Sequence, residues 1–155
     1  MESNNKYIPY GHQYIDSDDI SAVVDVLKSD WLTTGPKTKD FEAMLSEITD
    51  AKFAISCSSG TAALHLSMLA AGIGEGDAVI VPSITFASSA NAVRFVGAEV
   101  IFSDVDEETG LLTEEAVSNS LDLNRSDLNI KAVLPVHLNG QCIDYEKIYR
   151  FANDN

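Results

Sequence analysis

The sequence has 155 residues, of which 45% are hydrophobic, and this is the balance of a globular domain with its own core rather than of a disordered chain. Its 24 acidic residues outnumber its 10 basic ones and give a formal net charge of −14, which argues against nucleic acids and anionic membranes as partners. The polar start, the lack of a long apolar run and the wide separation of Cys57 and Cys142 predict a cytoplasmic protein with reduced thiols.

Two amphipathic helices are predicted in the first fifty residues. Apolar residues recur at helical spacing over residues 20–27, behind the capping candidate Asp16, and again over residues 41–48. The turn-forming residues at 31–36 predict a loop between the two helices. Residues 1–50 are therefore interpreted as an N-terminal helical segment with a loop.

From residue 51 on, short apolar runs alternate with helical patterns. Apolar strands separated by helices imply an α/β fold with a mostly parallel sheet and helices on both faces. Residues 51–155 are interpreted as this α/β domain. Strands are predicted at residues 53–57, 78–81, 99–102 and 130–137, and helices at 61–71, 86–96, from 113 onward and 144–152.

The polar residues 153–155 follow a predicted helix, at the point where the alternation would next supply a strand. We therefore expect the chain to be cut within a larger domain. A frayed natural terminus is the alternative.

A candidate anion site joins the first of these strands to its helix. Gly60 would let the backbone approach a ligand closely, and the free N–H groups of Thr61 and Ala62 at the helix start would point at it. The alternative is a helix capped by a serine or threonine that binds no ligand. No GxxxxGK[ST] loop occurs, and the glycines of residues 72–76 follow a helix and precede a strand, which is the wrong order for a dinucleotide fingerprint.

Phe86 begins a predicted helix just beyond the end of a strand. Ligands of open α/β sheets gather at that edge. The ring could stack on a flat ligand or pack in the core as most phenylalanines do, and both interpretations stay open.

Five segments in order resemble the DegT/DnrJ/EryC1/StrS family of sugar aminotransferases that depend on pyridoxal 5'-phosphate (PLP). The resemblance implies the N-terminal part of the large domain of an aspartate-aminotransferase-like (fold type I) PLP enzyme. The segments are residues 32–36, 59–64, 81–86, 104–106 and 135–141.

The same resemblance assigns roles to individual residues. It implies that Gly60, Thr61 and Ala62 bind the cofactor phosphate and that Phe86 lies on the face of the pyridine ring. It also places three residues near the substrate, with a hydrogen-bonded structural role as the alternative for the histidine. These three are Thr34, Gly35 and His137.

For the whole protein, the resemblance implies amino transfer from a donor such as glutamate to a nucleotide-linked keto sugar, in glycan or cell-surface polysaccharide synthesis, by a homodimer. The reaction needs a lysine that forms a Schiff base and an acid paired with the pyridinium nitrogen. The resemblance places both beyond residue 155. We therefore expect no catalytic residue and no metal ligand in this chain, and no activity from the chain alone.

Two other functions compete with this interpretation. Asp104 and Asp106 at a strand end could hold a divalent metal and a nucleotide sugar, as in glycosyltransferases, although acids followed by glycine at residues 106–110 also form turns readily. A non-catalytic relic that only binds phosphate is the other alternative.

Overall fold

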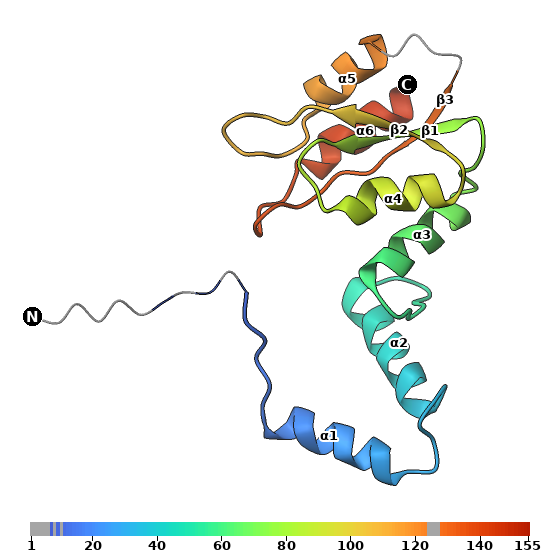
Figure 1. Cartoon of the computed structure of the whole chain (residues 1–155), viewed down its shortest axis with the longest axis vertical. Coiled ribbons are helices and arrows are strands. Elements are labelled where there is room, and N and C mark those ends of the chain that lie inside the picture. The colour runs from blue at the N-terminus through green and yellow to red at the C-terminus, as the bar shows by residue number, and fades with distance from the viewer. Residues whose placement is uncertain (1–6, 8, 10, 124–127) are drawn as a thin grey trace, which may run out of the picture. The chain divides into compact units, whose positions relative to one another are not determined.

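The computed structural model describes residues 7, 9, 11–123 and 128–155 of the chain. It divides into two compact units, Met1–Ser56 and Cys57–Asn155 (Figure 1). The division falls slightly later in the chain than the predicted boundary between residues 50 and 51.

The first unit contains helices α1 (Ser17–Lys28) and α2 (Pro36–Thr49). The predicted cap of α1 is confirmed, because the Asp16 carboxylate accepts the N–H groups of Asp18 and Asp19 at 2.9 and 3.1 Å. The Asp19 carboxylate in turn accepts the Asp16 N–H at 3.1 Å, which completes a capping box. Pro36 is the first residue of α2 rather than the last of the loop, a position where its missing N–H costs nothing.

The apolar faces of α1 and α2 are exposed within this unit. Leu27 of α1 is 65% exposed and Ile48 of α2 is 73% exposed, and none of the described residues up to Ser56 is buried. Helical spacing predicted these faces correctly, but the described residues of the first unit form no core.

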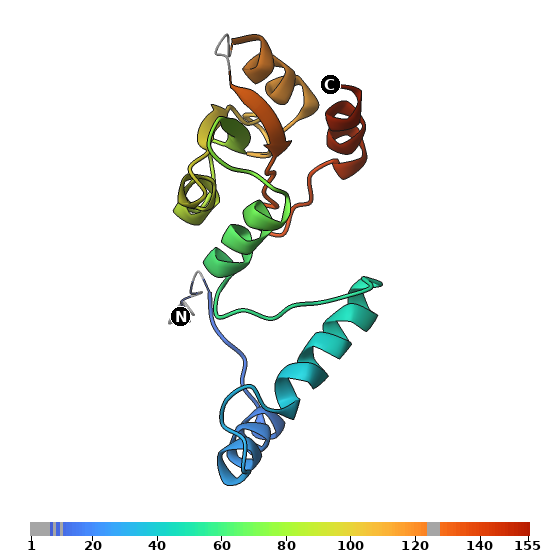
Figure 2. The same cartoon turned by 90° about the vertical axis from the view of Figure 1, so that its right-hand side faces the viewer.

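The second unit is built on a parallel sheet with the strand order β2-β1-β3. Helices lie on both sides of the sheet (Figures 1 and 2). The predicted parallel sheet is therefore confirmed. The strands are β1 (Asp77–Pro82), β2 (Glu99–Ser103) and β3 (Asn129–Val133), and the helices are α3 (Gly60–Ala70), α4 (Ala87–Phe95), α5 (Glu114–Leu123) and α6 (Tyr145–Asp154).

The central strand β1 supplies both halves of the core. Successive side chains of a strand point to opposite faces. Val79 and Val81 accordingly pack with α3 and α4 through Met68 and Val93, whereas Ile80 packs with α5 and α6. Ile80 and its two neighbours are fully buried, so the sheet is covered on both faces.

Two predicted strands differ from the structure. Residues 53–57 form no strand: a strand needs a hydrogen-bonded neighbour, and the sheet of the described residues, β2-β1-β3, does not include this segment. Phe53 and Ile55 are exposed instead. The strand predicted to reach residue 137 ends at Val133. The Leu134 N–H still bonds the Ile80 carbonyl at 2.8 Å, and Pro135 then has no N–H to continue the ladder.

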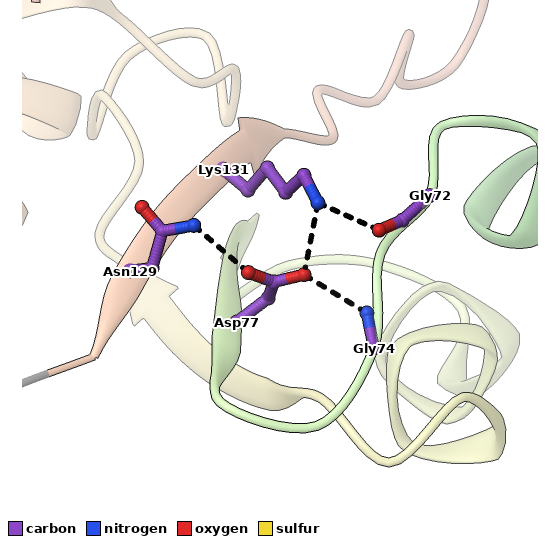
Figure 3. Close-up of polar contacts among 5 residues, drawn as sticks. All are labelled: Gly72, Gly74, Asp77, Asn129 and Lys131. Atoms are coloured by element: carbon purple, nitrogen blue, oxygen red, sulfur yellow. Dashed lines mark hydrogen bonds and ion pairs between the residues drawn. The ribbon is translucent and has the colours of Figure 1, made fainter.

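Polar groups at the amino end of the sheet bind one another (Figure 3). The Asp77 carboxylate accepts hydrogen bonds from the Asn129 amide at 2.8 Å, the Gly74 N–H at 3.0 Å and the Lys131 ammonium at 3.2 Å. Lys131 also bonds the Gly72 carbonyl at 2.6 Å. We call these five residues the amino-end network, and it ties β3 to the turn between α3 and β1.

Lys131 reaches this network from a bulge. Ala78 lies opposite Ile130 whereas Val79 lies opposite Ala132, so Lys131 is an extra residue in the ladder. Ile130 consequently packs on the α5 and α6 side of the sheet and Ala132 on the α3 and α4 side. The bulge lets an exposed cation sit between two core residues.

Candidate functional site

The candidate anion site is the start of α3. Ser59 caps this helix: its hydroxyl accepts the Ala62 N–H at 3.1 Å, and its carbonyl accepts the Ala63 N–H at 3.0 Å. The Ala62 N–H is therefore not free, contrary to expectation, because the Ser59 cap engages the same donor that we expected to point at a ligand. The N–H groups of Gly60 and Thr61 have no hydrogen-bond partner in the part of the chain that the structure describes.

Space for a ligand is open beside these two amides. A Cβ atom built on Gly60 would meet nothing within 4 Å, and Gly60 itself is exposed. The helix start also carries the positive end of the α3 dipole. Unpaired N–H donors, a positive dipole end and open space together fit a phosphate group.

The ring of Phe86 lies at the start of the neighbouring helix. Phe86 is the N-cap residue of α4, and its carbonyl accepts the Ser89 N–H at 3.0 Å. The residue is 77% exposed, so of the two interpretations above, packing in the core is wrong. The ring face is available to a flat ligand.

Helices α3 and α4 pack against each other, with the rings of His65 and Phe95 edge to face at 5.4 Å between centroids. Both helices begin toward the edge of the sheet at which β1 ends (Figure 1). We call Gly60, Thr61 and Phe86 the helix-start site.

Thr34 and Gly35 belong to the first unit. Thr34 has a left-handed backbone with φ of 47°, and Gly35 is the N-cap residue of α2. With Trp31 and Leu32 they line a pocket of about 240 Å³ between α1 and α2. A Cβ on Gly35 would lie 2.9 Å from the Trp31 Cβ, so this turn requires glycine.

His137 lies in the loop after β3 rather than at the strand end that was expected. Its Nδ1 accepts the Ile143 N–H at 3.2 Å, and the residue is exposed. A ring whose Nδ1 accepts a hydrogen bond carries its proton on Nε2 when neutral. His137 thus has the structural hydrogen bond considered above and still presents a donor to solvent.

Asp104 and Asp106 form turns. Asp106 Oδ1 accepts the N–H and the hydroxyl of Thr109 at 2.8 and 2.7 Å, and these hydrogen bonds, led by the hydroxyl, hold the pKa of Asp106 below its usual value. Asp104 Oδ1 accepts the N–H of Val105 at 2.9 Å. Among the described residues, no group of three His, Cys, Asp or Glu side chains is arranged to hold a metal ion.

One contact within the first unit gave no signal in the sequence. Glu42 of α2 accepts two hydrogen bonds from Ser56. The two residues are 14 positions apart, and neither belongs to a motif, so no periodicity or spacing signal could have indicated the pair.

In the described part of the chain, no helix is long and apolar enough to cross a membrane.

Comparison with known proteins gives a family match over most of the chain. The model of the DegT/DnrJ/EryC1/StrS aminotransferase family matches residues 13–155. The UDP-4-amino-4-deoxy-L-arabinose–oxoglutarate aminotransferase of Shewanella sediminis (strain HAW-EB3) is 42% identical over 146 residues, which are 94% of this chain and 36% of that protein.

Solved structures agree with this match. A protein from Streptococcus pneumoniae, assigned as a sugar aminotransferase and solved in PLP, PMP and apo forms, has a TM-score of 0.83 at 32% identity and covers 95% of this chain. An aminotransferase from Psychrobacter cryohalolentis has a TM-score of 0.83 at 36% identity and covers 94%. This chain spans 36% of each of these relatives.

The similarities bear on two of the predictions. The matched structures are α/β aminotransferases of fold type I, so the predicted fold class is confirmed. PLP, the predicted cofactor, is confirmed as the cofactor of these proteins by the PLP and PMP forms. The roles of Gly60, Thr61, Ala62, Phe86 and the substrate-side residues remain predictions.

Proposed function

Because the chain belongs to the DegT/DnrJ/EryC1/StrS aminotransferase family, we propose that the whole protein transfers an amino group from glutamate to a nucleotide-linked keto sugar. The name of the Shewanella relative supports this choice, since it pairs a UDP-linked amino sugar with oxoglutarate, the keto acid that corresponds to glutamate. A sugar of this kind would be used in the synthesis of cell-surface polysaccharide or other glycans.

The observation that carries the proposal is the open start of α3. The N–H groups of Gly60 and Thr61 would bind the cofactor phosphate, and the absence of a side chain on Gly60 lets the phosphate approach the backbone. Ser59 caps the helix at Ala62 and so fixes the direction in which the two remaining N–H groups point. When bound, PLP serves as an electron sink for the reacting carbon.

The remaining candidate residues would orient the ligands. The exposed ring of Phe86 would lie against the pyridine ring and restrict its tilt. His137 would donate a hydrogen bond from Nε2, because its Nδ1 is engaged by the Ile143 N–H. Thr34 and Gly35 would contact the sugar, in a loop whose left-handed backbone and close packing on Trp31 fix its shape.

We further propose that the 155-residue chain alone does not transfer amino groups. A lysine that reacts with PLP must first lose its proton, which requires a lowered pKa. The described lysines lie at the surface. Lys131 is bound by the amino-end network, and Asp144, through a hydrogen bond and its charge, raises the pKa of Lys147. The raised pKa of Lys147 favours its protonated amine.

The experiment that tests both statements adds PLP to the chain and to the full-length protein, reduces each with borohydride and identifies adducts by mass spectrometry. For the full-length protein, we expect one stoichiometric adduct on a single lysine and amino transfer from glutamate to a nucleotide-linked keto sugar. For the 155-residue chain, we expect no such adduct. A single stoichiometric adduct and amino transfer by the chain alone would contradict the second statement.

We also infer a cytoplasmic homodimer for the full-length protein. The apolar faces of α1 and α2 support this inference, since surfaces of this kind mark interaction sites. Analytical ultracentrifugation of the full-length protein would test the oligomeric state, and a monomer at micromolar concentration would contradict the inference.

A further inference from the structure

Glu42 of α2 holds Ser56 through two hydrogen bonds. Its Oε1 accepts the backbone N–H and the hydroxyl of Ser56, each at 2.8 Å. Both residues are half-buried. Hydrogen bonds to a carboxylate are stronger than those between neutral groups, and these two, with the backbone bond contributing most, hold the pKa of Glu42 below its usual value.

The segment around Ser56 has little else to fix it. Residues 53–57 belong to no helix or strand, and the side chains of Phe53 and Ile55 are exposed. Within the part of the chain that the structure describes, the bonds from Ser56 to Glu42 are the only hydrogen bonds that join this segment to a helix or strand. A segment with few buried contacts orders poorly unless a specific anchor holds it.

Ser56 is the third residue before Ser59, the cap of α3. Three residues of extended chain span at most about 10 Å. An anchor at Ser56 therefore restricts the backbone that leads into the turn of Ser59, Gly60 and Thr61. Because a binding site that is ordered in advance loses less entropy when its ligand arrives, such an anchor increases affinity.

Building on the function proposed above, we propose that Glu42 is a positioning residue for the cofactor phosphate. Its carboxylate fixes Ser56, and thereby orders the backbone that enters the phosphate-binding turn, without touching the cofactor itself. This role is absent from the motifs of the sequence, because it depends on a contact between α2 and a segment that only folding brings together.

The test compares two ligands in the full-length protein, PLP and pyridoxal, which lacks the phosphate. Glu42→Ala should weaken PLP binding by about tenfold or more, since it removes two hydrogen bonds to a charged group, and should change pyridoxal binding little. Glu42→Gln keeps an oxygen that accepts a hydrogen bond and should restore most of the PLP affinity. Glu47→Ala, at an exposed position of the same helix, is the matched control and should leave both affinities unchanged.

Hydrogen exchange gives a second readout that needs no ligand. In the protein without PLP, the amide of Ser56 should exchange faster in Glu42→Ala than in the wild type, measured by mass spectrometry on a peptide that covers residues 53–59. The Glu47→Ala variant should exchange like the wild type. A purely global loss of stability would instead raise exchange across the core strands as well.

Each outcome discriminates between the two proposals. If the wild type prefers PLP over pyridoxal and Glu42→Ala keeps the same preference, or loses both affinities equally, the role of Glu42 is wrong while the proposed function stands. If the wild type binds both ligands equally, the proposed function fails and this inference fails with it. If Glu42→Ala does not fold, Ser56→Ala, which removes the hydroxyl bond to Glu42, carries the test. A PLP affinity equal to that of the wild type together with unchanged exchange over residues 53–59 would overturn the proposal.

Discussion

The amino-end network and the helix-start site differ in whether their polar groups have hydrogen-bond partners. In the network, one carboxylate accepts three hydrogen bonds and one ammonium group binds two acceptors (Figure 3). At the helix starts, the N–H groups of Gly60 and Thr61 are left without partners in the described chain, and the Phe86 ring is exposed. The first region therefore contributes to stability, whereas the second retains capacity for a ligand. Variants in the two regions should therefore separate stability from PLP affinity in the full-length protein.

The largest expected effect is a loss of stability, caused by a substitution in the sheet between the two regions. Ile80→Ala removes a fully buried side chain from the central strand and should lower the free energy of unfolding by about 2–5 kcal/mol. Ile84→Ala, at a position that is 48% exposed, should cost much less. Urea unfolding followed by circular dichroism measures both. A cost at Ile80 no larger than that at Ile84 would contradict the role of β1 as the centre of the core.

Gly60→Ala should have the opposite signature. The added methyl group meets nothing in the protein, so the free energy of unfolding should not fall, whereas the methyl group would obstruct the phosphate. We expect PLP affinity to drop about tenfold, or ~1.4 kcal/mol, in an absorbance titration. Gly74→Ala, in the amino-end network and with the nearest atom at an ordinary 3.9 Å, should leave PLP affinity unchanged. Unaltered PLP binding by Gly60→Ala would contradict the assignment of the phosphate to this turn.

Phe86→Ala should weaken PLP binding to a smaller extent. Stacking of an aromatic ring contributes about 0.5–1.5 kcal/mol, so we expect a loss of about two- to tenfold, with thermal unfolding unchanged because the ring is exposed. Phe102→Ala is the matched control, since that ring is 60% exposed on β2. Equal effects of the two variants on PLP affinity would show that Phe86 has no special role.

The smallest expected effect is a pH dependence that originates in the amino-end network. The hydrogen bond from Asn129, followed by those from Gly74 and Lys131, lowers the pKa of Asp77 below the ordinary 3.8. A carboxylate with a depressed pKa in the folded state stabilises the fold above its unfolded pKa, and this contribution disappears as pH falls through the folded value. Asp77→Asn should therefore be less stable than the wild type at pH 7, and the difference should shrink below about pH 3.8.

Urea midpoints measured from pH 7 downward would check this prediction. Glu75→Gln, an exposed acid in the same turn, should show no such convergence with the wild type. A stability difference between Asp77→Asn and the wild type that stays constant with pH would mean that the charge of Asp77 contributes nothing to the network.

Local patterns predicted most of the fold. The cap at Asp16 and the buried run of β1 are determined by neighbouring residues, and both appear as expected. Pairing between distant segments could not be predicted from neighbouring residues. Apolar character alone suggested a strand at residues 53–57, yet a strand also requires hydrogen bonds to a neighbouring strand, and these depend on the whole topology. The bulge at Lys131 was missed for the same reason.

The candidate site was partly predictable. The order of strand and helix placed Gly60 and Phe86 at helix starts, because that order is a local property. What remained open was whether Phe86 is buried and which N–H groups the Ser59 cap engages, and these depend on packing and on the rotamer of one hydroxyl. Glu42 gave no signal, because nothing in the spacing of its neighbours relates it to Ser56.

The bulge in β3 also determines where the length of this strand can change. Removing one residue from a strand normally transfers all the following side chains to the opposite face. Removing Lys131 would not, because the ladder already steps from Ile130 directly to Ala132, and these two residues already face opposite sides of the sheet. Where relatives of this chain differ by one residue in β3, we therefore expect the difference to fall at residue 131, with the lysine and its bond to Asp77 lost together.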